Sequence, residues 1–166
     1  MKSKFITLKL GIKKNKTDGL LISLSKESIT ELIFTINKFA AAPVIISKHN
    51  ITKSNPKYIF INSGNANACT GKEGLANTKK ILNLLANRLN CNSYEIIIMS
   101  TGIIGRQLPI DDIQESITKN TFNNYSTLKD AATAVMTTDK YPKYLSKQYQ
   151  IGSKKITFSG LCKGAG

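Results

Sequence analysis

The residues best suited to chemistry lie in a turn that follows a buried strand. Ser100-Thr101-Gly102 comes directly after a continuous apolar run that ends at Met99. A glycine there lets the backbone approach a ligand, and its turn can leave N–H groups pointing outward to bind an anion or a developing oxyanion. The hydroxyl of Thr101 adds another donor. The alternative is a turn whose glycine serves only a positive φ angle, and the pattern leaves both interpretations open.

Two more places carry groups that can hold a charged ligand. Thr137-Thr138-Asp139 breaks an Ala-rich helical stretch, and its hydroxyls and carboxylate either bind a zwitterion or merely cap and turn the chain. Lys163 lies in a glycine-rich context, where it meets a carboxylate or stays solvated. The turn over residues 62–67, Asn-Ser-Gly-Asn-Ala-Asn, supplies amides that hold the loop together or face a polar substrate.

A catalytic triad or a metal centre is hard to assemble from this chain. It has one histidine, His49, which we interpret as solvated or structural, and three dispersed cysteines, Cys69, Cys91 and Cys162. Their odd number and wide spacing favour reduced thiols, with Cys69 as a small buried filler. We therefore expect neither a metal nor a cofactor. Asp111-Asp112 lies at a predicted helix start, where acidic side chains interact favourably with the helix dipole. We favour this structural role over acid–base catalysis.

Length and charge narrow the class of protein. A chain of 166 residues with 41% hydrophobic residues suits one domain, 1–166. No apolar run approaches the ~20 residues of a membrane span, and no secretory signal is apparent, so we expect a cytoplasmic protein. The net charge of +14 comes almost wholly from scattered lysines, with only Arg88 and Arg106 as arginines. This pattern favours compositional drift over a nucleic-acid-binding surface, which remains a rival hypothesis.

The hydrophobic pattern predicts alternating strands and helices. Strands are expected over 5–9, 20–24, 32–36, 57–62 and 94–99, and a hairpin over 149–158 around Gly152-Ser153. Helices are expected over 73–90, over 110–117 from Pro109, and over 128–136. Thr70 and Glu73 have the spacing of a capping box, and residues 43–47 fit a strand or a helix start. The fold class is α/β.

Several segments, taken in order, resemble hallmarks of the ornithine acetyltransferase family (ArgJ-type). They are Gly11–Lys14, Phe34–Lys38 with Ala42–Val44 after it, Asn62–Gly71, Ser100–Gly105, and Ala131–Asp139 followed by Pro142-Lys143. The resemblance implies a layered α/β sandwich of the ornithine acetyltransferase/DmpA-like type. It implies an enzyme of arginine biosynthesis that moves acetyl from N-acetylornithine to glutamate, with acetyl-CoA as a further donor in some members.

The family's precursor cuts itself before a threonine, and the resulting α and β chains stay together. The new N-terminal threonine is the nucleophile and its own amine can act as base, so no histidine is needed. By this resemblance Thr101 and Gly102 form the oxyanion hole, while Thr137 (or its neighbour Thr138) and Lys163 contact the amino-acid substrate.

The resemblance also implies partners. Residues 1–166 are expected to form the α-chain portion, ending before the cleavage motif, and to be inactive without a β chain that supplies the nucleophile. An α2β2 heterotetramer acting on N-acetylornithine and glutamate is expected, without nucleic acid, membrane or cofactor. Sheet surface that the β chain would cover should be exposed. The alternative is a non-catalytic binding module from a truncated gene.

Overall fold

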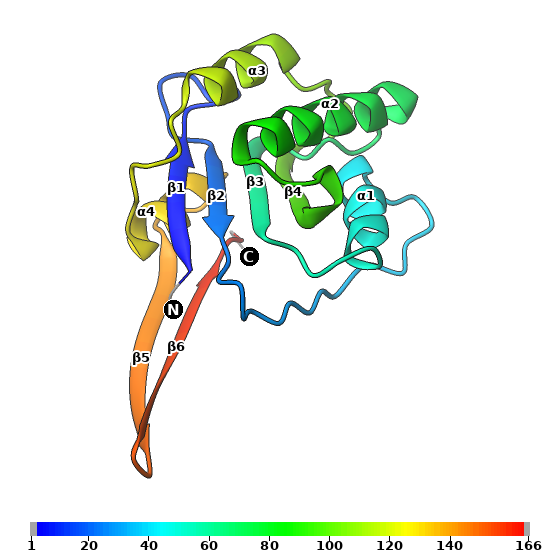
Figure 1. Ribbon diagram of the computed structural model, residues 1–166. Helices are drawn as coiled ribbons and strands as arrows, with labels where there is room; N and C mark the ends of the chain where they lie inside the picture. The colour runs from blue at the N-terminus through cyan, green and yellow to red at the C-terminus, as the bar shows by residue number, and fades with distance from the viewer. Residues whose placement is uncertain (1–2, 165–166) are drawn as a thin grey trace.

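The computed structural model describes residues 3–164, whose main feature is a four-stranded sheet (Figure 1). Its order is β1-β2-β3-β4, with β1 (Lys4–Leu8), β2 (Gly19–Ser23), β3 (Tyr58–Asn65) and β4 (Ile96–Ile103). The first three strands pair antiparallel, and β4 runs parallel to β3. A parallel pair requires a crossover, which α2 (Gly71–Leu89) provides. The four predicted strands of this sheet are confirmed.

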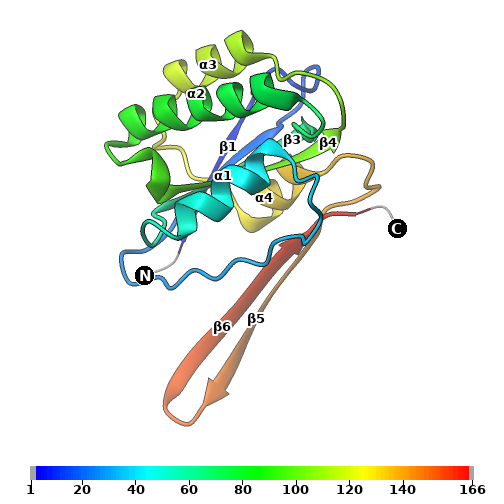
Figure 2. The same ribbon diagram turned by 90° about the vertical axis from the view of Figure 1, so that its right-hand side faces the viewer.

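Helices cover both faces of the sheet, because each strand alternates its apolar side chains between two cores. On one face lie α1 (Ala42–Ile51), α2 and α3 (Ile110–Lys119), and on the other lies α4 (Leu128–Val135) (Figure 2). Leu21 and Phe60 point to the larger core, whereas Leu20 points to the alanines of α4. The predicted α/β class is therefore confirmed.

The chain just before α4 also closes on the first strand. The N–H of Ser126 donates to the carbonyl of Phe5 at 2.8 Å, and the hydroxyls of Ser126 and Thr7 lie 2.9 Å apart. α4 then packs over β1 and β2. The first strand of the sheet is thus hydrogen-bonded to residues about 120 positions further along the chain.

The last two strands leave the body of the molecule. β5 (Lys143–Ile151) and β6 (Lys154–Cys162) form an antiparallel hairpin that projects away from the sheet in both views (Figures 1 and 2). The predicted hairpin around Gly152 is confirmed, and its arms are longer than the pattern indicated. Nearly every residue of the two strands is exposed.

Two local predictions are wrong, each for a physical reason. Residues 32–36, with Leu32 and Phe34 half-buried and Ile33 and Ile36 fully exposed, form no strand, because they do not pair with any strand of the described chain. Thr70 stands at the start of α2 without capping it, because its hydroxyl donates to Asn67 Oδ1 at 2.7 Å.

The remaining boundaries shift by a few residues. Residues 43–47 belong to α1, a short 3₁₀ turn (Ser93–Glu95) precedes β4, and α4 ends at Val135. α4 carries a capping box that the pattern did not single out, in which Thr127 accepts from the N–H of Asp130 and Asp130 accepts from that of Thr127. Across residues 3–164, no helix combines the length and apolarity that crossing a bilayer demands.

Candidate functional site

Gly102 lies near the end of β4 at a point where the backbone of β3 comes very close. Its φ is +136°, and a Cβ atom there would lie 2.2 Å from the carbonyl carbon of Gly64 and 2.5 Å from the nitrogen of Asn65. The register of the two strands shifts at Gly64 and Asn65. Only glycine fits this position, for both its conformation and its packing.

The outer edge of β4 is partly capped by side chains of α1. The hydroxyl of Ser47 donates to the carbonyl of Ile98 at 2.7 Å and accepts from its N–H at 2.9 Å, and the amide of Asn50 donates to the carbonyl of Ile96 at 2.9 Å. Backbone groups alternate direction along a strand, so Gly102, four residues after Ile98, directs its N–H to this same outer edge. Thr101 faces β3 with its backbone.

Lys163 connects the two hydroxyls that the sequence singled out. Its Nζ donates to Thr101 Oγ1 at 2.7 Å and to Thr137 Oγ1 at 2.9 Å. An ammonium has three N–H donors, so two bonds among residues 3–164 leave one donor for an anionic ligand. The structure therefore brings Thr101, Gly102, Thr137 and Lys163 together at the end of β4. Thr138 is exposed and is not one of the hydroxyls that Lys163 contacts.

Asp139 fixes the loop that carries Thr137 and the segment that carries Lys163. Its carboxylate, 1% exposed, accepts from Lys143 Nζ at 2.8 Å, from the N–H of Gly164 at 2.7 Å and from that of Thr137 at 3.1 Å. The hydrogen bond from Lys143, followed by those from the two backbone N–H groups, holds the pKa of Asp139 well below its usual range. The same contact raises the pKa of Lys143, whose ammonium also donates to the Gly164 carbonyl.

A second hydrogen-bond network supports the loop that carries Thr137. The sequence pattern did not reveal this network. The buried carboxylate of Asp18 accepts from the N–H groups of Leu10 (2.5 Å), Ile12 (2.8 Å) and Lys13 (2.8 Å). The loop so formed directs Lys13 Nζ onto the carbonyl of Met136 at 2.9 Å. Burial lowers the pKa of Lys13, and the negative charge of Asp18 opposes that effect. An Asp-Gly pair after a polar turn was the only local signal.

The asparagine-rich turn is structural. Asn62, Asn65 and Asn67 are buried, and their amides donate to carbonyls of Asn65, Arg106, Gln107 and Gly74. These bonds hold the turn against the chain that follows β4, so the loop-holding interpretation is the correct one. Cys69, which has a positive φ of 58°, is exposed, so its prediction as a buried filler is wrong.

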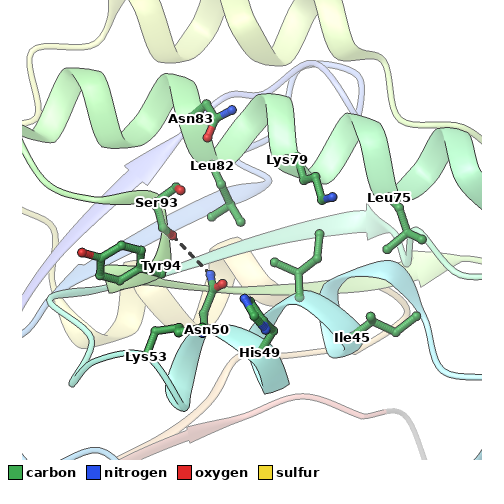
Figure 3. Close-up of a pocket in the computed structure, with 11 residues that line it drawn as sticks. Ile45, His49, Asn50, Lys53, Leu75, Lys79, Leu82, Asn83, Ser93 and Tyr94 are labelled. Atoms are coloured by element: carbon green, nitrogen blue, oxygen red, sulfur yellow. Dashed lines mark hydrogen bonds between the residues drawn. The ribbon is translucent and has the colours of Figure 1, made fainter.

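A separate hollow lies away from this cluster. It has a volume of about 740 Å³ between α1 and α2, with Ile46, Leu75 and Leu82 among its apolar residues and His49, Lys53 and Lys79 among its basic ones (Figure 3). None of the five predicted site residues lines it. His49 is exposed beside it. No group of three or more potential metal ligands occurs within residues 3–164.

The four-residue cluster offers one ammonium, two hydroxyls and a backbone N–H directed to an open strand edge. Such a set can hold a carboxylate and stabilise an oxygen that gains negative charge. Its members come from the end of β4, the loop after α4 and the segment after β6.

Comparison with known proteins gives a consistent result. The model of the ArgJ family matches residues 4–166. An "Arginine biosynthesis bifunctional protein ArgJ, mitochondrial" from Dictyostelium discoideum is 42% identical over 164 residues, 96% of this chain and 37% of that protein. A protein of the same name, without the word mitochondrial, from Geobacter sulfurreducens is 34% identical over 98% of this chain and 42% of its own length. The chain thus spans about two fifths of these curated relatives.

Two solved structures share the fold over almost the whole chain. The ArgJ crystal structure from Bacillus halodurans superposes with a TM-score of 0.87 at 28% identity, covering 99% of this chain and 87% of that one. The ornithine acetyltransferase from Mycobacterium tuberculosis, solved with ornithine, gives 0.84 at 29% identity, covering 99% and 89%. With the family model matching nearly every residue, the chain belongs to the ArgJ family.

Proposed function

We propose that this chain is the N-terminal one of two polypeptides that together form the active site of an acyltransferase of arginine biosynthesis. In the complete enzyme, acetyl passes from the amine of N-acetylornithine to that of glutamate. The observation that carries the proposal is the bridge that Lys163 makes between Thr101 and Thr137, next to Gly102, whose N–H is directed to the outer edge of β4. Oxyanion donors stabilise the tetrahedral intermediate of acyl transfer, and a cation beside them can bind the carboxylate of an amino-acid substrate.

The nucleophile belongs to a second polypeptide in this proposal. A threonine hydroxyl there attacks the acetyl carbonyl, and its proton passes to that residue's own N-terminal amine. The carbonyl oxygen becomes an oxyanion that accepts from the Thr101 hydroxyl and the Gly102 N–H. Collapse breaks the C–N bond and releases ornithine with the proton, which leaves an acetyl-threonine ester. The amine of glutamate then attacks this ester, the acyl C–O bond to the threonine breaks, and the proton lost by the amine returns to the threonine oxygen as N-acetylglutamate leaves.

Lys163 and Thr137 bind the amino-acid portion in this scheme. The third ammonium hydrogen of Lys163 meets the α-carboxylate common to N-acetylornithine and glutamate, and the loop held by Asp139 and Lys13 keeps Thr137 in place. A solved neighbour that was crystallised with ornithine supports an amino-acid substrate.

The lengths of the similar proteins support a two-piece enzyme. The same region covers 87% to 89% of the solved chains but only 37% to 42% of the curated relatives. The solved chains are therefore much shorter than the curated proteins and close to this chain in length. A two-chain enzyme formed by self-cleavage, assembling as α2β2, fits this difference.

A chimera tests the proposed function. The 166 residues are joined in register to the remaining part of the Dictyostelium discoideum relative, and release of ornithine from N-acetylornithine is measured with glutamate as acceptor. Thr101→Ala should lower kcat by roughly 10²–10³-fold with little change in KM, because one oxyanion donor is lost. Thr101→Ser should restore most of the rate.

A separate variant tests the proposed substrate-binding role of Lys163. Lys163→Met should raise KM for glutamate by roughly 10–100-fold, the value of a charged hydrogen bond. Thr118→Ala, on the exposed face of α3, is the control and should match the parent chimera. An inactive parent chimera, or a Thr101→Ala chimera as fast as the parent, would overturn the proposal.

A further inference from the structure

The hollow between α1 and α2 is built from one face of each helix. Leu75, Lys79 and Leu82 lie on the same side of α2, because residues at i, i+4 and i+7 of a helix share a face. Figure 3 shows these side chains extending from α2 toward α1, where His49 and Asn50 face them. Side chains from two separate helices therefore converge on one space.

Hydrogen bonds hold α1 in place, so the hollow is preformed. The amide of Asn50 donates to the carbonyl of Ser93 at 3.2 Å and to that of Ile96 at 2.9 Å. Ser47 of the same helix is bonded to Ile98 of β4. Because of these bonds, α1 cannot move into the hollow without leaving the edge of the sheet. Small-molecule sites are usually preformed, and the volume of about 740 Å³ lies within their range of about 300–1,000 Å³.

The floor of the hollow is apolar. Ile46 and Leu82 form it and belong to the main core of the protein. Ile45 and Tyr94, 47% and 40% exposed, lie on either side of it (Figure 3). A ligand with an apolar body would remove this surface from water, which favours binding by about 25 cal/mol for each Å² buried.

The side chains around this floor that can carry charge at neutral pH are all basic. His49 lies on α1, Lys53 follows that helix, and Lys79 lies on α2. Among residues 3–164, no aspartate or glutamate lines the hollow, and neither lysine forms an ion pair. Lysines are common on this chain, but these flank one apolar floor from opposite walls. Charge of one sign around a cleft attracts a ligand of the other sign.

We propose that the hollow between α1 and α2 is a binding site for a small amphipathic anion. Its apolar body lies over Ile46 and Leu82, and its carboxylate or phosphate head faces Lys79 and His49. The apolar floor disfavours a purely polar anion, and the basic side chains disfavour a cation. The site is separate from the Thr101–Lys163–Thr137 cluster, so the inference does not depend on the proposed acyl transfer.

The test compares four ligands that share one tail and differ in the head group. Octanoate, octyl phosphate, 1-octanol and octylammonium are titrated into the isotope-labelled 166-residue chain, and amide chemical shifts are followed by NMR. Both anions should bind at least about fivefold more tightly than 1-octanol, the value of a hydrogen bond to a charged group in this setting, and octylammonium should bind more weakly than 1-octanol. The tighter of the two anions identifies the head group. Shifts should occur at amides over 45–53 and 75–83.

A pair of adjacent lysines tests the charge. Lys79→Met should weaken octanoate at least about fivefold and leave 1-octanol unchanged. Lys80→Met is the matched control, because Lys80 is also an exposed lysine of α2 but lines a different hollow, beside Asp111. It should leave the affinity for both ligands unchanged.

A second pair of variants tests the location. Asn83 is exposed and lines the hollow, so Asn83→Trp should fill part of it and weaken octanoate at least about tenfold. Asn87→Trp, one turn further along α2 and outside the hollow, is the control and should bind as the parent does. Both positions are exposed, so the thermal midpoints should equal that of the parent.

Several outcomes would overturn the site. These are equal affinities for octanoate and 1-octanol, equal effects of Lys79→Met and Lys80→Met, or shifts confined to the β5–β6 hairpin. Failure of all four ligands to bind would also reject it. A dimer of the chain that buries α1 and α2 would assign this surface to a second copy instead.

Discussion

Gly102 and Gly64 approach each other so closely that a single Cβ on Gly102 would lie 2.2 Å from the carbonyl carbon of Gly64. The contact is between backbones of adjacent parallel strands, so no side chain can move aside to relieve it. The end of β4 and the turn after β3 are therefore held at a fixed separation. This contact also fixes the position of the outer edge of β4.

Gly102→Ala should destabilise the chain by at least about 2 kcal/mol, since it adds overpacking to an unfavourable positive φ. Gly160→Ala is the matched control, because a Cβ there would meet nothing within 4 Å. Urea unfolding measures both variants. A Gly102→Ala chain as stable as Gly160→Ala would show that the two strands separate easily.

Asp139→Asn should destabilise the loop before β5 at neutral pH, because the amide loses the ionic contact with Lys143. The folded pKa of Asp139 is depressed, so its contribution is complete above the unfolded pKa of about 4 and declines as the pH falls towards the folded value. The stability difference between parent and variant should shrink from pH 5 to pH 2. Denaturation at several pH values measures it, with Glu115→Gln at an exposed i,i+4 pair as the control for an ordinary surface carboxylate. A difference that grows on acidification would contradict the assigned contacts.

Thr127→Ala should cost about 1 kcal/mol, because it removes the side-chain oxygen that accepts the N–H of Asp130 at the start of α4. Thr127→Ser retains this acceptor and should restore the loss. Thermal unfolding with both variants checks the capping box. Equal stability of the alanine and serine variants would mean that α4 is held by its apolar face alone.

Ser47→Ala should cost about 1–3 kcal/mol, because a buried N–H and a buried C=O of Ile98 both lose their partner. The amide of Ile98 should also exchange faster with solvent. Ser54→Ala, at an exposed hydroxyl after α1, serves as the reference. If the exchange rate of Ile98 stays unchanged, another group replaces Ser47 at the strand edge.

Apolar alternation was enough to predict the sheet but not every strand. The predicted strands over 5–9, 20–24 and 57–62 correspond to β1, β2 and β3, each of which pairs with another strand. Residues 32–36 have the same apolar character but remain unpaired, because a strand requires a pairing partner that a local pattern cannot reveal. The capping prediction for Thr70 failed for a similar reason, because the hydroxyl of Thr70 donates to Asn67 Oδ1.

The candidate site was predictable only in part. The Gly-bearing turn after a buried strand indicated Thr101 and Gly102 from local sequence. Lys163 lies 62 residues from Thr101, and only the family resemblance joined them beforehand. Asp18 and Lys13 escaped notice because their role depends on contacts with the loop after α4, 123 residues beyond Lys13. Local periodicity carries no information about such contacts.

The closure of Ser126 on Phe5 and Thr7 has a consequence for synthesis on the ribosome. β1 and β2 leave the exit tunnel before Ser126 and before α4, which covers Leu20 and lies more than 100 residues further along the chain. At ordinary translation rates this delay is on the order of ten seconds. During that time the side of β1 and β2 that α4 later covers has no apolar partner.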